Sequence, residues 1–135
     1  MKVILDTNVF VSGLFFAGPP YQILKAWRDG RIDLAVSLEI LGEYEAVAVR
    51  LKSRYGGVDI HPIIELVATR GYLVDAKPLP HRVCVDPDDD VFLACAVASA
   101  TGTIVSGDRH LLAASGYARI EVLRPRVFVD RYLGG

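Results

Sequence analysis

The sequence predicts an α/β fold, a three-layer sandwich in which helices flank a mostly parallel central sheet. Short apolar runs such as Val3-Ile4-Leu5 and Thr103-Ile104-Val105 alternate with longer segments that have helical periodicity. Short apolar runs are typical of buried parallel strands, and strands that alternate with helices favour a layered architecture. Glycines and prolines separate the segments, as expected of turns.

The N-terminal half is expected to form two strands and four helices. In order, these are a strand at 3–5, helices at 8–16 and 21–29, a strand at 32–36, a long helix from residue 38 to the glycines at 56–57, and a helix at 62–70. Gly18-Pro19-Pro20 ends the first helix and Gly30 the second. Ser37 is placed to cap the long helix.

The C-terminal half is expected to continue the alternation. Residues 72–74 form a strand or an extended link, and a loop with two prolines follows at 77–81. A helix of small residues, FLACAVASA, comes after the acidic run at 86–90. The remaining elements are a strand at 103–105, a short helix through 111–112, a strand at 120–123 and a helix at 125–133, with a proline in its first turn.

The composition suits one globular domain spanning residues 1–135. Hydrophobic residues make up 52% of the chain and charged residues 23%, which allows a sizeable core. The 15 basic and 16 acidic residues give a formal net charge of −1, so a strongly basic coat for nucleic acid is not indicated. A small enzyme could still hold phosphates through metal ions and a local basic rim.

The cysteines and the N-terminus indicate a reduced, soluble protein. Cys84 and Cys95 lie in apolar surroundings and are expected to be small core residues. Their spacing suggests neither a zinc site nor a disulfide framework. The N-terminus lacks the features of a secretory signal, and the apolar runs are too short to span a bilayer. We therefore expect a cytoplasmic protein with no membrane partner.

Four acidic residues occupy comparable places in the predicted fold. Asp6 and Asp108 follow predicted strands, Asp90 opens the helix before the strand at 103–105, and Glu43 lies about two turns into the long helix. Ligands of open parallel sheets bind beyond the carboxyl ends of the strands. These four side chains are therefore predicted to converge at that edge.

Converging carboxylates repel each other unless a cation lies among them. Hard oxygen ligands suit Mg²⁺ or Mn²⁺ rather than zinc or copper. Two such ions can bind a phosphodiester, activate a water and stabilise the leaving oxygen. Thr7 and Asn8 could then fix the Asp6 carboxylate or contact a phosphate.

Each acid taken alone has a simpler explanation. Asp6 and Asp108 could cap helices, Asp90 could interact with a helix dipole, and Glu43 could be solvated. The combination and its order favour a shared site. A calcium loop in DPDDD is rejected because valine stands at the required glycine and at the closing acid. A phosphotransfer motif of the haloacid dehalogenase type is disfavoured by Asn8, which stands where the second aspartate is needed.

Three segments resemble the signature segments of PIN domains. They are LDTNVFVSGLF, SLEILGEYEAV and DPDDDVFLACAVASATGTIVSGDRHLL, and they occur in the expected order over most of the chain. The resemblance is strongest to small stand-alone prokaryotic PIN proteins that are assigned as toxin components of toxin–antitoxin pairs. It implies a ribonuclease that cleaves single-stranded RNA with one or two Mg²⁺ or Mn²⁺ ions and leaves a 5′-phosphate and a 3′-hydroxyl.

The resemblance also assigns residues. The four acids of the family match Asp6, Glu43, Asp90 and Asp108, and its supporting polar residues match Asn8 and Ser106. Two nearby residues, Glu39 and Glu45, are alternatives to Glu43, and Asp89 is a less favoured substitute for Asp90. No acid of the set is missing, so the chain is not expected to be an inactive member.

The resulting hypothesis is a metal-dependent endoribonuclease, with a cognate antitoxin and a homodimer as implied partners. The candidate RNA contacts are Arg109, His110, Arg50, Lys52 and Arg54, whose alternative role is a solvated basic face. Tyr21, Trp27 and Tyr44 are candidates for a dimer interface, with core packing favoured for Trp27. The alternative functions are a module that binds RNA or an antitoxin without cutting, and a structure-specific DNA nuclease.

Overall fold

The computed structural model describes residues 1–56 and 59–134, which are organised around one parallel sheet. Its strands are β1 (Lys2–Leu5), β2 (Asp33–Ser37), β3 (Tyr72–Val74), β4 (Thr103–Val105) and β5 (Glu121–Leu123). The strand order is β3-β2-β1-β4-β5, and every neighbouring pair is parallel. The predicted parallel sheet is confirmed, and residues 72–74 are a strand rather than a link.

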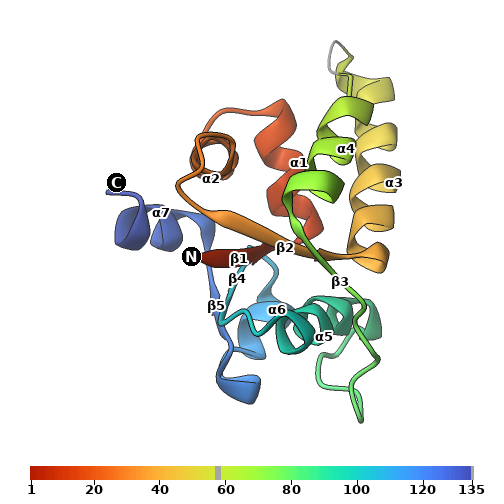
Figure 1. Cartoon of the computed structure of the whole chain (residues 1–135), viewed down its shortest axis with the longest axis vertical. Helices are drawn as coiled ribbons and strands as arrows, with labels where there is room; N and C mark the ends of the chain where they lie inside the picture. The colour runs from red at the N-terminus through yellow and green to blue at the C-terminus, as the bar shows by residue number, and fades with distance from the viewer. Residues whose placement is uncertain (57–58, 135) are drawn as a thin grey trace.

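Helices cover both faces of the sheet, as Figure 1 shows. One face carries α1 (Thr7–Phe15), α2 (Pro19–Arg28), α3 (Leu38–Tyr55) and α4 (His61–Arg70). The other face carries α5 (Asp90–Ser99) and α6 (Arg109–Ala113), while α7 (Pro125–Tyr132) packs against α2. Short 3₁₀ turns occur at Pro87–Asp89 and Tyr117–Arg119. The predicted three-layer sandwich is therefore confirmed.

The central strand β1 is fully enclosed by these layers. Val3, Ile4 and Leu5 have no exposed surface, which explains why the strand is a continuous apolar run. Cys84 and Cys95 are also buried, as predicted, and burial raises the pKa of each thiol to about 12. Within the described residues, no helix combines the length and apolar character needed to cross a membrane.

The strand order reverses between β1 and β4, and we call the region beyond the carboxyl ends of these two strands the crevice. The chain runs from β1 to β2 on one side, whereas β4 pairs with β1 on the other side. Such a switch in strand order separates the connecting helices and is where ligands bind in open α/β sheets. The Asp6 amide extends the ladder by donating to the Val105 carbonyl at 3.0 Å, so the side chain of Asp6 begins at this crevice.

Helix starts agree with the predicted caps, with one difference in phase. Ser37 caps α3 by accepting a hydrogen bond from the Ile40 amide at 3.3 Å. The helix after the acidic run begins at Asp90, because the preceding residues form a 3₁₀ turn. The spacing of Val97 from Leu93 and Ala94 predicts a buried position on this helix, but the side chain of Val97 is 53% exposed, so that prediction is wrong.

Tyr44 connects α3 to the end of β1. Its hydroxyl donates a hydrogen bond to the Leu5 carbonyl, and its ring stacks on Phe10 with centroids 4.1 Å apart. The side chain is fully buried, so Tyr44 does not lie on an interface surface. Trp27 is buried as favoured, and Tyr21 is exposed. The Tyr44 contacts hold the first half of α3 beside the residue that follows β1.

We predict that Tyr44→Phe lowers the free energy of unfolding by about 1 to 2 kcal/mol, because the stacking remains while a buried carbonyl loses its donor. Urea unfolding should show this loss. Tyr21→Phe removes the same hydroxyl from a side chain that is 43% exposed, and it should leave the stability unchanged. Equal unfolding energies for wild type and Tyr44→Phe would contradict this role.

Candidate active site at the carboxyl edge of the sheet

Asp6 is a buried carboxylate at the centre of the crevice. Its side chain is only 5% exposed, Oδ1 accepts the Val9 amide at 2.9 Å, and Oδ2 accepts a hydrogen bond from the Ser106 hydroxyl. Burial raises the pKa of Asp6, and the charges of Asp108 and Glu43 raise it further, against the effect of the two hydrogen bonds. Asp6 caps α1 and also lies in a field of like charges.

Ser106 and Asp108 extend this arrangement from β4. Ser106 is fully buried, and its Oγ accepts the Asp108 amide at 2.9 Å while its hydroxyl donates to Asp6. The Asp108 Oδ1 caps α6 by accepting the His110 amide at 2.7 Å and the Leu111 amide at 3.3 Å. The short serine side chain therefore links two acids that are far apart in the sequence.

Glu43 reaches the same crevice from α3. Its Oε1 accepts a hydrogen bond from Thr7 Oγ1 at 2.5 Å, and its charge contributes to the raised pKa of Asp6. Glu43 is half-buried, whereas the alternatives Glu39 and Glu45 are exposed. Glu43 is the acidic residue of α3 whose charge raises the pKa of Asp6.

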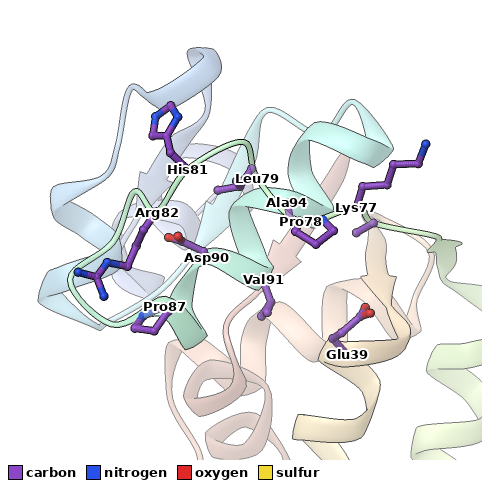
Figure 2. Close-up of a pocket in the computed structure, with 11 residues that line it drawn as sticks. Glu39, Lys77, Pro78, Leu79, His81, Arg82, Pro87, Asp90, Val91 and Ala94 are labelled. Atoms are coloured by element: carbon purple, nitrogen blue, oxygen red, sulfur yellow. The ribbon is translucent and has the colours of Figure 1, made fainter.

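Asp90 lies at the start of α5 with its carboxylate bound to a neighbouring loop. Its Oδ2 accepts the Val83 amide at 2.9 Å, and its Oδ1 accepts the Cys84 amide at 2.7 Å. Burial opposes ionisation of this group, but the two amide hydrogen bonds prevail and lower the pKa of Asp90. Figure 2 shows the carboxylate among the loop residues. Asp90 thus fastens the loop before α5.

Asp89 interacts with the charges of the crevice. Burial raises the pKa of Asp89 from its usual 3.8 to about 6, and the charges of Asp108, Asp86 and Asp6 add to that effect. Asp89 and Asp90 are both half-buried, whereas Asp88 is exposed. Asp89 is the last residue of the 3₁₀ turn that precedes α5.

The other predicted site residues are spread more widely. Asn8 is exposed in the first turn of α1, Arg109 is exposed, and His110 is half-buried on α6. The C-terminal half of α3 exposes three basic residues, Arg50, Lys52 and Arg54. The first of them, Arg50, lies seven residues after Glu43, roughly 10 Å along the helix axis. No described contact joins this basic group to the crevice.

The donors of the crevice suit a hard cation, but they are not gathered tightly. In the described ranges, the side-chain ion pairs join Arg28 to Asp29 and Arg131 to Glu121, so neither compensates the acids of the crevice. Across residues 1–56 and 59–134, no three His, Cys, Asp or Glu side chains are grouped so that they could hold a metal ion together. The chemistry of the donors fits Mg²⁺ or Mn²⁺, and closer approach of the carboxylates would be needed.

Sequence reasoning missed the loop that Asp90 holds. Its partners are the backbone amides of Val83 and Cys84, and amides carry no side-chain signal that a sequence could reveal. Tyr44 was also missed as a support of the site, although its position next to Glu43 on a capped helix was a usable signal.

We predict that Asp89→Asn stabilises the metal-free protein by about 1 kcal/mol at neutral pH, after allowance for solvent screening. Folding raises this pKa, so the native state binds protons more strongly than the unfolded chain. The contribution of protonated Asp89 to the free energy of unfolding is complete below pH 3.8 and is lost as the pH rises through about 6. The gain from Asp89→Asn should therefore grow across this interval in urea unfolding with a chelator.

The control for this titration is Asp130→Asn, which changes an exposed aspartate on α7. The gain from Asp89→Asn should exceed any change that Asp130→Asn causes over the same pH interval. A constant difference between wild type and Asp89→Asn would show that the crevice does not oppose the charge of Asp89.

Comparisons with known proteins agree with the fold described above. A model of the PIN domain family matches residues 2–110. The uncharacterized protein MJ1680 of Methanocaldococcus jannaschii is 29% identical over 144 residues, which cover 98% of this chain and 92% of that protein.

Two crystal structures share the fold. PAE2754 from Pyrobaculum aerophilum has a TM-score of 0.61 and 16% identity, over 99% of this chain and 90% of that chain. FitAcB from Neisseria gonorrhoeae has a TM-score of 0.55 and 18% identity, over 92% of this chain and 98% of that chain. On the extent of the family match, this chain belongs to the PIN domain family, whose members are generally nucleases.

Proposed function

We propose that this protein is a Mg²⁺- or Mn²⁺-dependent endoribonuclease that cleaves single-stranded RNA. The observation that carries the proposal is the buried carboxylate of Asp6, whose pKa is raised by burial and by the charges of Asp108 and Glu43. A cation would relieve this repulsion, and it would also bind a phosphodiester next to the carboxylates. The sequence resemblance to small PIN ribonucleases selects RNA as the substrate.

The proposed ligands are Asp6, Glu43, Asp90 and Asp108, which would hold one or two ions. A bound ion would lower the pKa of a water and neutralise charge on the phosphate. Ser106 keeps Asp6 oriented through its hydrogen bond, and Thr7 does the same for Glu43. These hydrogen bonds would keep the carboxylates in place before substrate arrives, which reduces the cost of ordering them.

Asp90 has to change partners in this proposal. Both of its oxygens accept amides from the loop, so ligation by Asp90 requires at least one of those bonds to open or to be shared. Asp89 is the alternative third carboxylate because its charge already interacts with Asp6 and Asp108. The two residues differ by one position, and variants can separate them.

The remaining roles follow the sequence resemblance. Asn8 would contact the scissile phosphate from the first turn of α1, and the exposed basic side chains of α3 and α6 would contact the RNA chain. A toxin role with a cognate antitoxin, a homodimer and a cytoplasmic location complete the proposal. A short neighbouring gene with a DNA-binding N-terminus would support the toxin role.

We predict that Asp6→Asn lowers the rate of RNA cleavage with Mg²⁺ or Mn²⁺ by at least about a hundredfold, because it removes a charged ligand while keeping the shape. Cleavage of labelled single-stranded RNA, with single-stranded DNA and a chelator in parallel, measures this. Asp130→Asn is the matched control and should cleave as wild type does.

The results of that assay separate the proposed function from its rivals. Unchanged cleavage by folded Asp6→Asn would contradict the metal site. Cleavage of DNA in preference to RNA would favour the DNA nuclease, and RNA binding without cleavage by wild type would favour a regulatory module.

We predict that Asp90→Ala abolishes cleavage, that Asp89→Ala reduces it in part, and that Asp88→Ala leaves most of it. Asp88 is exposed and serves as the control on the same turn. Calorimetric titration of the three variants with Mn²⁺ gives the order of metal affinity. If Asp89→Ala weakens binding more than Asp90→Ala does, the third carboxylate is Asp89, and Asp90 serves only to hold the loop.

A further inference from the structure

A cavity of about 320 Å³ opens beside the candidate active site (Figure 2). One wall is the start of α5, a second is the loop between β3 and α5, and the third is Glu39 on α3. Apolar side chains form much of the lining, among them Pro78, Leu79, Val91 and Ala94. The cavity is large enough for a planar heterocycle and is mainly apolar, as small-ligand sites commonly are.

The cavity and the candidate active site share structural elements. Asp90 lines the cavity and belongs to the proposed carboxylate set. Glu39 lies four residues before Glu43 on α3, so the two side chains share one helix face about one turn apart. A ligand in the cavity would therefore lie about one helical turn from the carboxylates. A phosphate at the carboxylates and a base in the cavity can belong to one nucleotide or to adjacent ones.

The charges around the cavity fit an anionic chain that carries an apolar group. Lys77, His81 and Arg82 come from the loop, and Figure 2 shows their side chains extending outward from it rather than filling the interior. Cations placed at a mouth would attract the phosphates of a nucleic acid. The interior offers aliphatic surface from Leu79, Val91 and Ala94 to the faces of a base, as the apolar walls of pockets that hold an unstacked base do.

We propose that this cavity binds the base of a nucleotide next to the scissile phosphate of single-stranded RNA. This inference rests on the proposed nuclease function and specifies how its substrate is held. The Glu39 carboxylate on the wall is a hydrogen-bond acceptor only, so it favours a base whose exocyclic amine can donate to it, such as adenine, cytosine or guanine. The phosphates pass along the loop, from which Lys77 and Arg82 extend at opposite ends of the cavity.

The test combines a substrate that lacks one base with a protein whose cavity is filled. Val91→Trp fills the cavity from α5, and Val127→Trp is the matched control because Val127 is 39% exposed on α7. Labelled RNAs carry one abasic nucleotide at each position around the cleaved bond. Their binding is measured by fluorescence anisotropy with a chelator, and their cleavage with Mn²⁺.

One abasic position should weaken binding and slow cleavage by about tenfold for wild type and for Val127→Trp. Val91→Trp should bind the intact RNA about as weakly as wild type binds the abasic RNA, with no further loss from the missing base. If Val91→Trp does not fold, Leu79→Ala on the loop wall replaces it and should reduce the same dependence. An abasic effect that persists unchanged in the cavity variants overturns the proposal.

A second comparison tests the role of Glu39. At the sensitive position, purine, which lacks the exocyclic amine, replaces adenine. Wild type should bind the adenine RNA several-fold more tightly, roughly as one hydrogen bond to a charged acceptor provides, and Glu39→Ala should remove the difference. Equal affinity of wild type for both RNAs overturns the assignment of Glu39.

The outcomes distinguish this inference from the function on which it rests. Cleavage without any cavity dependence overturns the base site and leaves the nuclease in place. Base-dependent binding without cleavage supports the base site and contradicts the nuclease. Absence of both RNA binding and cleavage overturns both. Loss of self-association in Val91→Trp with an unchanged abasic effect assigns the cavity to a protein interface and overturns the proposal.

Discussion

The arrangement of this protein depends on a carboxylate that is buried at the end of the central strand. Asp6 is 5% exposed, and a charged group in that position needs hydrogen bonds or a counter-charge. The Val9 amide and the Ser106 hydroxyl supply the hydrogen bonds. They do not neutralise the charges of Asp108 and Glu43, which act on the same carboxylate. A divalent cation would compensate all of these charges, and this connects the fold to a nuclease chemistry.

Several side chains of the crevice serve the fold and the candidate site together. Asp6 caps α1 and Asp108 caps α6, which are the simpler explanations that sequence analysis offered for each. In the structure, these caps also aim the two acids at the space between β1 and β4, because both helices start directly after those strands or their turns. The same two acids therefore cap helices and form the candidate site. Variants of these acids need a measurement of stability as well as of activity.

Much of the fold could be predicted because the strands are short buried apolar runs. The run at Val3-Ile4-Leu5 and the cap at Ser37 each have a local physical cause, and the structure contains both. The phase of α5 could not be predicted, since its residues are small or apolar on nearly every side and Val97 does not mark the buried face. A 3₁₀ turn precedes α5, so α-helical spacing does not describe the acidic residues before Asp90.

The candidate site was predictable only as far as its residue types and strand positions allow. Parallel pairing of β1 with β4 brings Asp6 near Ser106, whereas the sequence predicted only a mostly parallel sheet without its strand order. The loop amides that hold Asp90 depend on tertiary packing, which no spacing in the sequence encodes. The cavity beside Glu39 has the same origin, because loop, helix and α3 each supply one wall.

The carboxylates around Asp6 are proposed to hold a divalent cation. Crystals grown with saturating Mn²⁺ and measured at the manganese absorption edge test this proposal, since anomalous difference density locates the ion without any assumption about activity. We expect a peak at coordination distance, about 2.0 to 2.3 Å, from oxygens of Asp6 and Asp108. A map with ordered Asp6 and Asp108 side chains and no manganese peak between them would contradict the claim.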